Sequence, residues 1–229
     1  MNFIQEGFAQ AVTLLVNFDP ATYSAISATL RASSLAMAAS LALGIPLGYL
    51  LGFLDFRLKK QVRIVVNTLL SLPTVFIGLV IYALLTRKGP LGEMGLLFSI
   101  PGIAIGQVIL ALPIVVALTA TAVEAADSKL RLTLMSLGAN RRQIAAGTLW
   151  EVRLGILAAA VTATGRVLTE VGISLMVGGN IKWHTRTITT AIALETSKGE
   201  FGMGIALGLV LLLIALAVNM FLAGLRRRS

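Results

Sequence analysis

Long apolar runs separated by short polar intervals divide the chain into predicted membrane spans. Each run reaches the roughly 20 residues that a helix needs to cross a bilayer, and the runs cover about 26–54, 62–86, 102–125, 154–177 and 203–224. The second run contains Pro73, and the fourth contains two charged residues. Because the backbone of a span must satisfy its own hydrogen bonds in lipid, we predict an all-α membrane protein with five transmembrane helices.

The segment before the first run is too short to cross. Ile4, Phe8, Val12 and Leu15 recur at helical spacing, and Asp19-Pro20 stops the pattern. We therefore predict an N-terminal interfacial helix in residues 1–20, lying on the membrane, and a transmembrane domain in residues 21–229. The first residues lack the basic start and the small-residue cleavage site of a signal peptide, so we expect this helix to be retained.

Small residues form a stripe along the first predicted span. They occur at every fourth position, as Ala36, Ser40, Gly44, Gly48 and Gly52. Such a stripe allows helices to approach closely in lipid. It indicates either packing within the chain or a contact between subunits.

The interval at 127–153 is the longest charge-bearing stretch of the chain. Leucine and isoleucine supply an apolar side, Arg131, Arg141 and Arg142 supply a basic side, and Gly138 interrupts the helical pattern. One interpretation is two short helices that meet at Gly138 and present a knuckle to a partner. The other is a simple interfacial loop.

Composition and charge restrict the function classes. The chain is 57% hydrophobic and 13% charged, with no Cys and a single His, His184. Disulfides, thiol nucleophiles and Cys/His metal sites are therefore excluded, and no metal site is expected. The net charge of +9 comes from clusters beside apolar runs, which is typical of membrane loops and not of nucleic-acid binding.

The distribution of Lys and Arg predicts the orientation. The segments 55–63 and 127–153 and the C-terminal tail hold 12 of the 19 basic residues. The positive-inside bias therefore places the interval 127–153 and the C-terminus in the cytoplasm and the N-terminus outside.

Two charges, Arg166 and Glu170, lie well inside the fourth run. Their i,i+4 spacing puts them on one face of a continuous helix and lets them pair. Arg166 is thirteen residues after Arg153, about 20 Å along a helix, which is near the middle of the membrane. Intramembrane charges usually face a bundle interior or a pathway, so the pair either fixes helix packing or serves a gate.

Polar residues follow the fourth run on the predicted outer side. Backbone N–H groups and hydroxyls in this segment can donate hydrogen bonds to a dianion without holding it as tightly as a fixed cluster of positive charges would. The residues that offer such donors are Gly178, Gly179, Asn180, Thr185, Thr187, Thr189 and Thr190. Alternatively, Thr185 or Thr187 caps a short helix over 188–197.

Part of the polar interval resembles a known docking loop. Leu137-Gly138-Ala139, followed by Arg141-Arg142-Gln143-Ile144, is similar to the cytoplasmic loop by which permease subunits of ABC importers dock their ATPase. Six residues before the Gly, where that family has Glu-Ala-Ala, this chain has Leu132-Thr133-Leu134; Glu124-Ala125-Ala126 stands at the wrong spacing. The resemblance implies that Leu137, Gly138, Ala139, Arg141 and Arg142 couple to an ATPase.

A second stretch resembles the permeases of molybdate and tungstate importers. It comprises Glu170-Val171-Gly172-Ile173-Ser174 with Gly178-Gly179-Asn180-Ile181 and the Thr-rich segment after Thr185. Residues 85–92 favour the tungstate branch. The resemblance implies the type I ABC importer permease architecture, a homodimer with two ATPase subunits and an extracytoplasmic oxyanion-binding protein, all in or on a prokaryotic cytoplasmic membrane. The candidate gate or pathway residues are Arg166, Glu170, Ser174, Asn180, Thr185 and Thr187.

The expected role is thus that of a permease, not of an enzyme. No phosphate-binding loop of the Gly-x-x-x-x-Gly-Lys-Ser/Thr kind is present, so ATP and Mg²⁺ are expected in a partner ATPase, and no cofactor is expected in this chain. A permease for another oxyanion, such as sulfate, is an alternative. A secondary transporter would need coupling-ion carboxylates in the membrane, and only Glu170 qualifies. An intramembrane enzyme acting on lipid would need a nucleophile and base or metal ligands; the absence of Cys, the single loop His and the isolated Ser residues argue against it.

Overall fold

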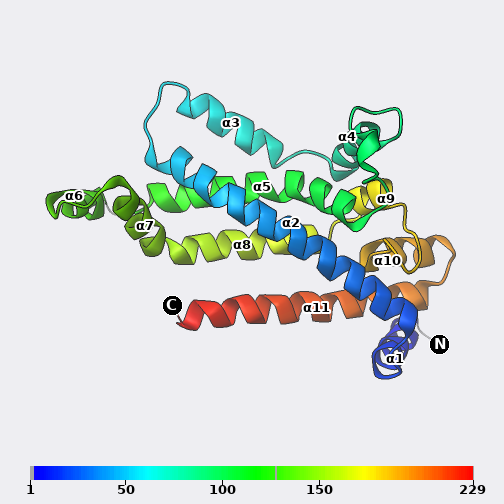
Figure 1. The fold of residues 1–229 in the computed structure, drawn as a ribbon. Helices are drawn as coiled ribbons and strands as arrows, with labels where there is room; N and C mark the ends of the chain where they lie inside the picture. The colour runs from blue at the N-terminus through cyan, green and yellow to red at the C-terminus, as the bar shows by residue number, and fades with distance from the viewer. Residues whose placement is uncertain (1–2, 127, 229) are drawn as a thin grey trace.

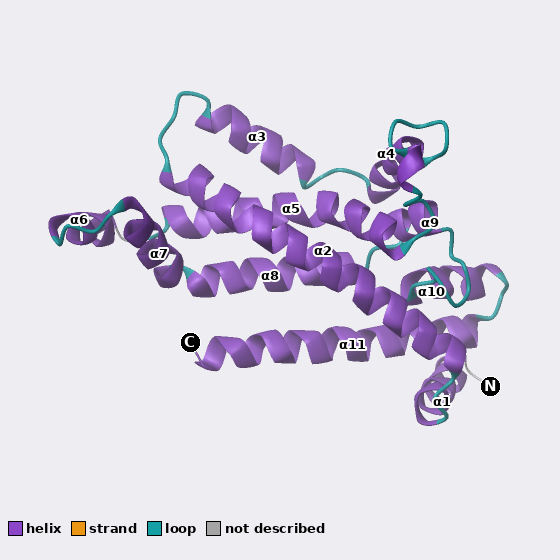
Figure 2. Ribbon diagram, viewed as in Figure 1, coloured by secondary structure: helices purple, strands orange, loops and turns teal. Residues whose placement is uncertain are grey.

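The computed structural model describes residues 3–126 and 128–228, and every regular element in them is helical. Asp127, the first residue of the predicted polar interval, lies outside the described residues. Three helices run side by side (Figure 1), namely α5 (Ile100–Glu124), α8 (Arg153–Leu168) and α11 (Phe201–Arg228), and the long helix α2 (Pro20–Phe53) crosses them obliquely. Short loops join them to the shorter helices (Figure 2).

The predicted second and fourth spans are not straight helices. The second consists of α3 (Lys59–Leu69) and α4 (Thr74–Leu85), which meet at 95°. Pro73 lies in the break, and a proline disfavours helical backbone in the residue before it. The fourth consists of α8 and α9 (Gly172–Gly178), and α8 makes a 64° angle with the preceding α7 (Arg141–Glu151).

The number of spans agrees with the prediction when bent pairs are counted as single spans. Three helices, α2, α5 and the 201–221 part of α11, are long and apolar enough to cross alone. When each of the bent pairs α3–α4 and α7–α8 is counted as one span, the described residues supply up to five, although the predicted fourth run, 154–177, corresponds to α8 and α9. The all-α membrane architecture is confirmed, but two of the spans are broken.

The N-terminal helix α1 (Phe3–Val16) forms at the predicted place and packs chiefly against α11. Only Gly7 and Ala11 of this helix are buried. A Cβ atom on Gly7 would lie 2.6 Å from Cγ2 of Ile205, so glycine permits the contact. Asp19 then accepts a hydrogen bond from the backbone N–H of Thr22 and caps the first turn of α2.

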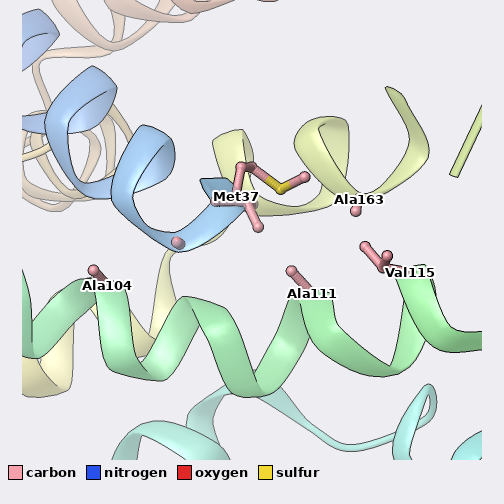
Figure 3. Close-up of a cluster of buried hydrophobic side chains, with 7 residues drawn as sticks. Met37, Ala104, Ala111, Val115 and Ala163 are labelled. Atoms are coloured by element: carbon pink, nitrogen blue, oxygen red, sulfur yellow. The ribbon is translucent and has the colours of Figure 1, made fainter. Parts of the chain in front are cut away.

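The small-residue stripe of α2 packs within the chain, against α5. Built Cβ atoms on Gly44 and Gly48 would approach side-chain atoms of Val115 and Thr119 to 2.7 and 2.6 Å. Further along, Met37 of α2, Ala111 of α5 and Ala163 of α8 point toward one another in a buried cluster (Figure 3). Of the two alternatives for the stripe, packing within the chain is therefore confirmed.

Ion pairs join α3 to the end of α5. Glu124 lies 3.3 Å from Nζ of Lys59 and 2.7 Å from the guanidinium of Arg63. Lys59 also lies 3.5 Å from Asp55 and donates a hydrogen bond to the carbonyl of Gly52. The turn after α2 is thereby held at the end of the bundle that carries α6 (Ser128–Ser136) and α7.

Candidate functional site

The polar interval forms two helices that meet at Gly138, as one of the two interpretations predicted. We call α6, α7 and the turn between them the α6–α7 knuckle. Gly138 has φ +75°, a left-handed conformation, and its N–H donates to the carbonyl of Met135 while the N–H of Ala139 donates to that of Leu134. This pair of bonds is a Schellman motif, in which glycine is the favoured residue because it has no Cβ.

The second helix of the knuckle begins at a reciprocal cap. The side chain of Asn140 accepts from the N–H of Gln143, and the side chain of Gln143 accepts from the N–H of Asn140. The turn between the helices is therefore fixed at both of its ends, by the Schellman motif on one side and the cap on the other.

The knuckle projects beyond the end of the helical bundle (Figure 1). Leu137 is 77% exposed, and Arg141 and Arg142 are exposed at the start of α7, while Trp150, near the end of α7, is 67% exposed. Large apolar side chains next to cations are typical of a surface that binds another protein. All five predicted coupling residues thus lie on or beside one projecting turn.

A cavity of about 630 Å³ lies between the knuckle and the ends of α2 and α5. Its lining includes Lys59 and Glu124 on one side and Leu130, Leu132 and Met135 of α6 on the other. Sequence reasoning did not predict this space, because it depends on how the knuckle sits below the bundle.

Glu170 does not form the predicted pair with Arg166. Helix α8 ends at Leu168, so the two residues do not share a continuous helix, and no ion pair joins them in the described part of the chain. Instead the Glu170 carboxylate accepts hydrogen bonds from the N–H groups of Ile173 at 2.6 Å and Ser174 at 3.0 Å, and from the Ser174 hydroxyl at 3.0 Å. Glu170 is 2% exposed and holds the first turn of α9.

Hydrogen bonds tie the break between α8 and α9 to α10 (Ile188–Ser197) and α2. The hydroxyl of Thr189 donates to the carbonyl of Glu170 at 2.8 Å. The N–H of Ile188 donates to the hydroxyl of Thr29 on α2 at 2.9 Å. All of these groups are buried, so the break has a defined geometry that two other helices, α10 and α2, support.

The remaining polar residues that the sequence predicts on the outer side also have structural partners. Thr187 caps α10 in a reciprocal box with Thr190, which confirms the capping alternative for Thr187. Thr185 instead closes the preceding loop, because its hydroxyl donates to the carbonyl of Gly178 and accepts from the N–H of Ile181. The side-chain oxygen of Asn180 accepts from Nε of Arg186 at 3.0 Å.

Arg166 differs from these residues because its side chain is exposed on the bundle. Thr162, Arg166 and Thr169 are exposed at helical spacing, and together we call them the α8 polar stripe. Both threonine hydroxyls donate to carbonyls within α8. Sequence reasoning identified Arg166 and missed the two threonines, although their three- and four-residue spacing from Arg166 was readable.

Comparisons with known proteins agree with this architecture. A tungstate uptake system permease protein of Campylobacter jejuni subsp. jejuni is 48% identical over 227 residues, which cover 99% of this chain and 95% of that protein. A protein of the same description from Peptoclostridium acidaminophilum is 41% identical, with 96% of each covered. A chain of a bacterial alginate ABC transporter, solved with a pentasaccharide-bound periplasmic protein, superposes with a TM-score of 0.79 at 20% identity, covering 98% of this chain and 86% of that one.

The fold is therefore the type I ABC importer permease architecture that the sequence predicted. The family model for binding-protein-dependent transport system inner membrane components matches residues 44–229, which include the end of α2, the other bundle helices, the knuckle and the α8 polar stripe. This chain is a multi-pass membrane protein and belongs to the family of binding-protein-dependent transport system inner membrane components.

Proposed function

We propose that the chain is the transmembrane permease subunit of an ATP-driven importer that moves an oxyanion, with tungstate as the favoured substrate. The observation that carries the proposal is identity of 48% along 99% of the chain to a protein described as a tungstate uptake permease. Molybdate is the second substrate to test. The permease itself performs no covalent chemistry; ATP and Mg²⁺ bind to a partner ATPase.

In this proposal two copies face each other and the α8 polar stripe lines the route between them. The Arg166 guanidinium attracts a dianion, while the hydroxyls of Thr162 and Thr169 stay bonded to carbonyls of α8. Since Glu170, Ser174, Thr185 and Thr187 are buried and hydrogen-bonded, we assign them to positioning α9 and α10. An extracytoplasmic binding protein delivers the oxyanion at the α10 end.

The α6–α7 knuckle docks the ATPase in the cytoplasm, with the N-terminus of the chain on the outer side. A displacement of α7 passes directly to α8, because Val152 is the sole residue between the two helices. Movement of the knuckle thus reorients the α8 polar stripe, and the ATPase cycle shifts the route between outward and inward states.

Uptake by proteoliposomes tests this function. The chain is reconstituted with a candidate ATPase and a candidate oxyanion-binding protein from the same genome, and internal tungsten is measured by mass spectrometry with molybdate or sulfate as competitor. We expect accumulation that requires ATP and the binding protein, and that molybdate reduces more than sulfate. Accumulation driven by an ion gradient without ATP would instead identify a secondary transporter.

Copurification of the ATPase tests the docking surface separately. Arg142→Glu reverses an exposed charge of the knuckle, and Gly138→Pro removes both the positive φ and the N–H that bonds Met135. Both variants should lose the ATPase, whereas Lys182→Glu at the α10 end, a matched reversal, should retain it. Equal ATPase recovery in all three variants contradicts docking at the knuckle.

A further inference from the structure

Helix α3 leaves basic side chains without acidic partners at one end. Lys59 and Arg63 pair with Glu124, but Arg57 and Lys60 have no ion pair in the described part of the chain. The four cations lie around an open cavity of about 520 Å³. Asp55 is the acidic residue in its lining, so the cavity carries a net positive charge.

The other side of α3 is apolar and uncovered. None of the eleven residues of α3 is buried. Large apolar side chains at i, i+4, i+7 and i+11 share one face, and all four are exposed: Leu58, Val62, Val65 and Leu69. We call them the α3 apolar stripe. Such a stripe is stable against hydrocarbon and costly in water.

The length and direction of α3 match one leaflet of a bilayer. Eleven residues at 1.5 Å each make a helix of about 16 Å, close to half of the roughly 30 Å hydrocarbon core. Helix α3 lies along the bundle axis, with its basic end near the knuckle (Figure 1). It stops where the chain turns by 95° into α4.

We propose that α3 and the turn before it bind an anionic phospholipid. The phosphate lies against Arg57 and Lys60, with Arg63 beside it, and one acyl chain follows the α3 apolar stripe toward the middle of the membrane. A second copy of the chain fits this surface less well, because a contact through the stripe would leave the unpaired Arg57 and Lys60 on the opposite side of α3 without a partner. A free anion would make no use of the stripe.

Native mass spectrometry of the purified chain tests the proposal. The protein is exchanged into vesicles with equal phosphatidylglycerol and phosphatidylcholine, re-extracted in mild detergent, and scored for retained lipid. We expect wild type to retain phosphatidylglycerol preferentially. Arg57→Gln with Lys60→Gln should reduce its occupancy by roughly 30-fold, since each cation near a membrane surface contributes about fivefold. Arg87→Gln with Lys88→Gln, the same charge change at the far end, should leave it unchanged.

Further variants separate a lipid from other occupants. Val62→Ser with Val65→Ser should lower phosphatidylglycerol retention although it removes no charge. Equal retention by the Arg57/Lys60 variant overturns the proposal, and so does complete displacement of the lipid by inorganic phosphate. Val65→Cys supplies the sole thiol in a chain without cysteine; efficient disulfide dimers in membranes would show that a second copy covers the stripe, and the lipid site would be refuted.

Discussion

Replacing Glu170 by alanine should destabilise the permease without changing any exposed surface. The carboxylate is buried and accepts three hydrogen bonds, two of them from the backbone N–H groups of Ile173 and Ser174. Both of these residues are fully buried, so water does not replace the lost acceptor. The first turn of α9 would be left with two unsatisfied donors.

The size of the effect follows from these two donors. An unsatisfied buried group costs about 1–3 kcal/mol, so Glu170→Ala should cost roughly 2–6 kcal/mol. That is a large fraction of the about 5–15 kcal/mol that holds a typical domain together. Glu170→Gln keeps one acceptor oxygen and should cost about half as much. Glu93→Gln, an exposed carboxylate without an ion pair in the described residues, serves as the control.

The assay is the temperature at which half of the detergent-solubilised protein is lost from the monodisperse peak in size-exclusion chromatography. We expect Glu93→Gln to have the same midpoint temperature as wild type, Glu170→Gln to have a lower one, and Glu170→Ala to have the lowest. An unchanged midpoint for Glu170→Ala would refute the structural role. If that stable variant also failed to transport, Glu170 would belong to a gate, as the sequence first allowed.

Three other substitutions separate packing, transport and coupling. Gly48→Ala should lower the same midpoint by the equivalent of about 1–3 kcal/mol, because its Cβ would lie 2.6 Å from that of Thr119. Gly208 has open space around it, so Gly208→Ala should be neutral or stabilising. Equal midpoints for the two variants would contradict the close packing of α2 on α5. Arg166→Ala should reduce oxyanion uptake by tenfold or more, about 1.4 kcal/mol, at an unchanged midpoint, and normal uptake would remove Arg166 from the route. Asn140→Ala should remove the N-terminal cap of α7, lower the stability of that helix by about 1 kcal/mol, and weaken ATPase copurification. Full recovery of the ATPase with this variant would show that the cap does not order the docking surface.

Hydropathy and local signals predicted most of the fold. The apolar runs located the spans, and Gly138 marked the turn of the knuckle because glycine is common where a helix ends in left-handed backbone. The helix over 188–197 and its Thr187 cap follow from short-range chemistry, and both were predicted. These features depend on residues within a few positions of one another, which a sequence shows directly.

The broken spans could not be predicted from hydropathy. A window average measures how apolar a segment is and carries no information about its direction, so a 95° turn leaves the score unchanged. Pro73 gave a local signal for the first break. The second break depends on Glu170 bonding to residues three and four positions ahead, and on Thr29, which is 159 positions from Ile188. The expected pairing of Arg166 with Glu170 was wrong because it assumed an unbroken helix.

The contact between α1 and α11 joins the first and last helices of the chain, and this has a consequence for biosynthesis. Helix α1 is made before α11, is too short to span, and finds its main packing partner only when α11 has been made. Until then, the aromatic and aliphatic side chains of α1 have the membrane surface as their apolar environment. The docking of α1 therefore marks the insertion of α11, and a product truncated before residue 201 would be distinguishable by an undocked, protease-sensitive α1.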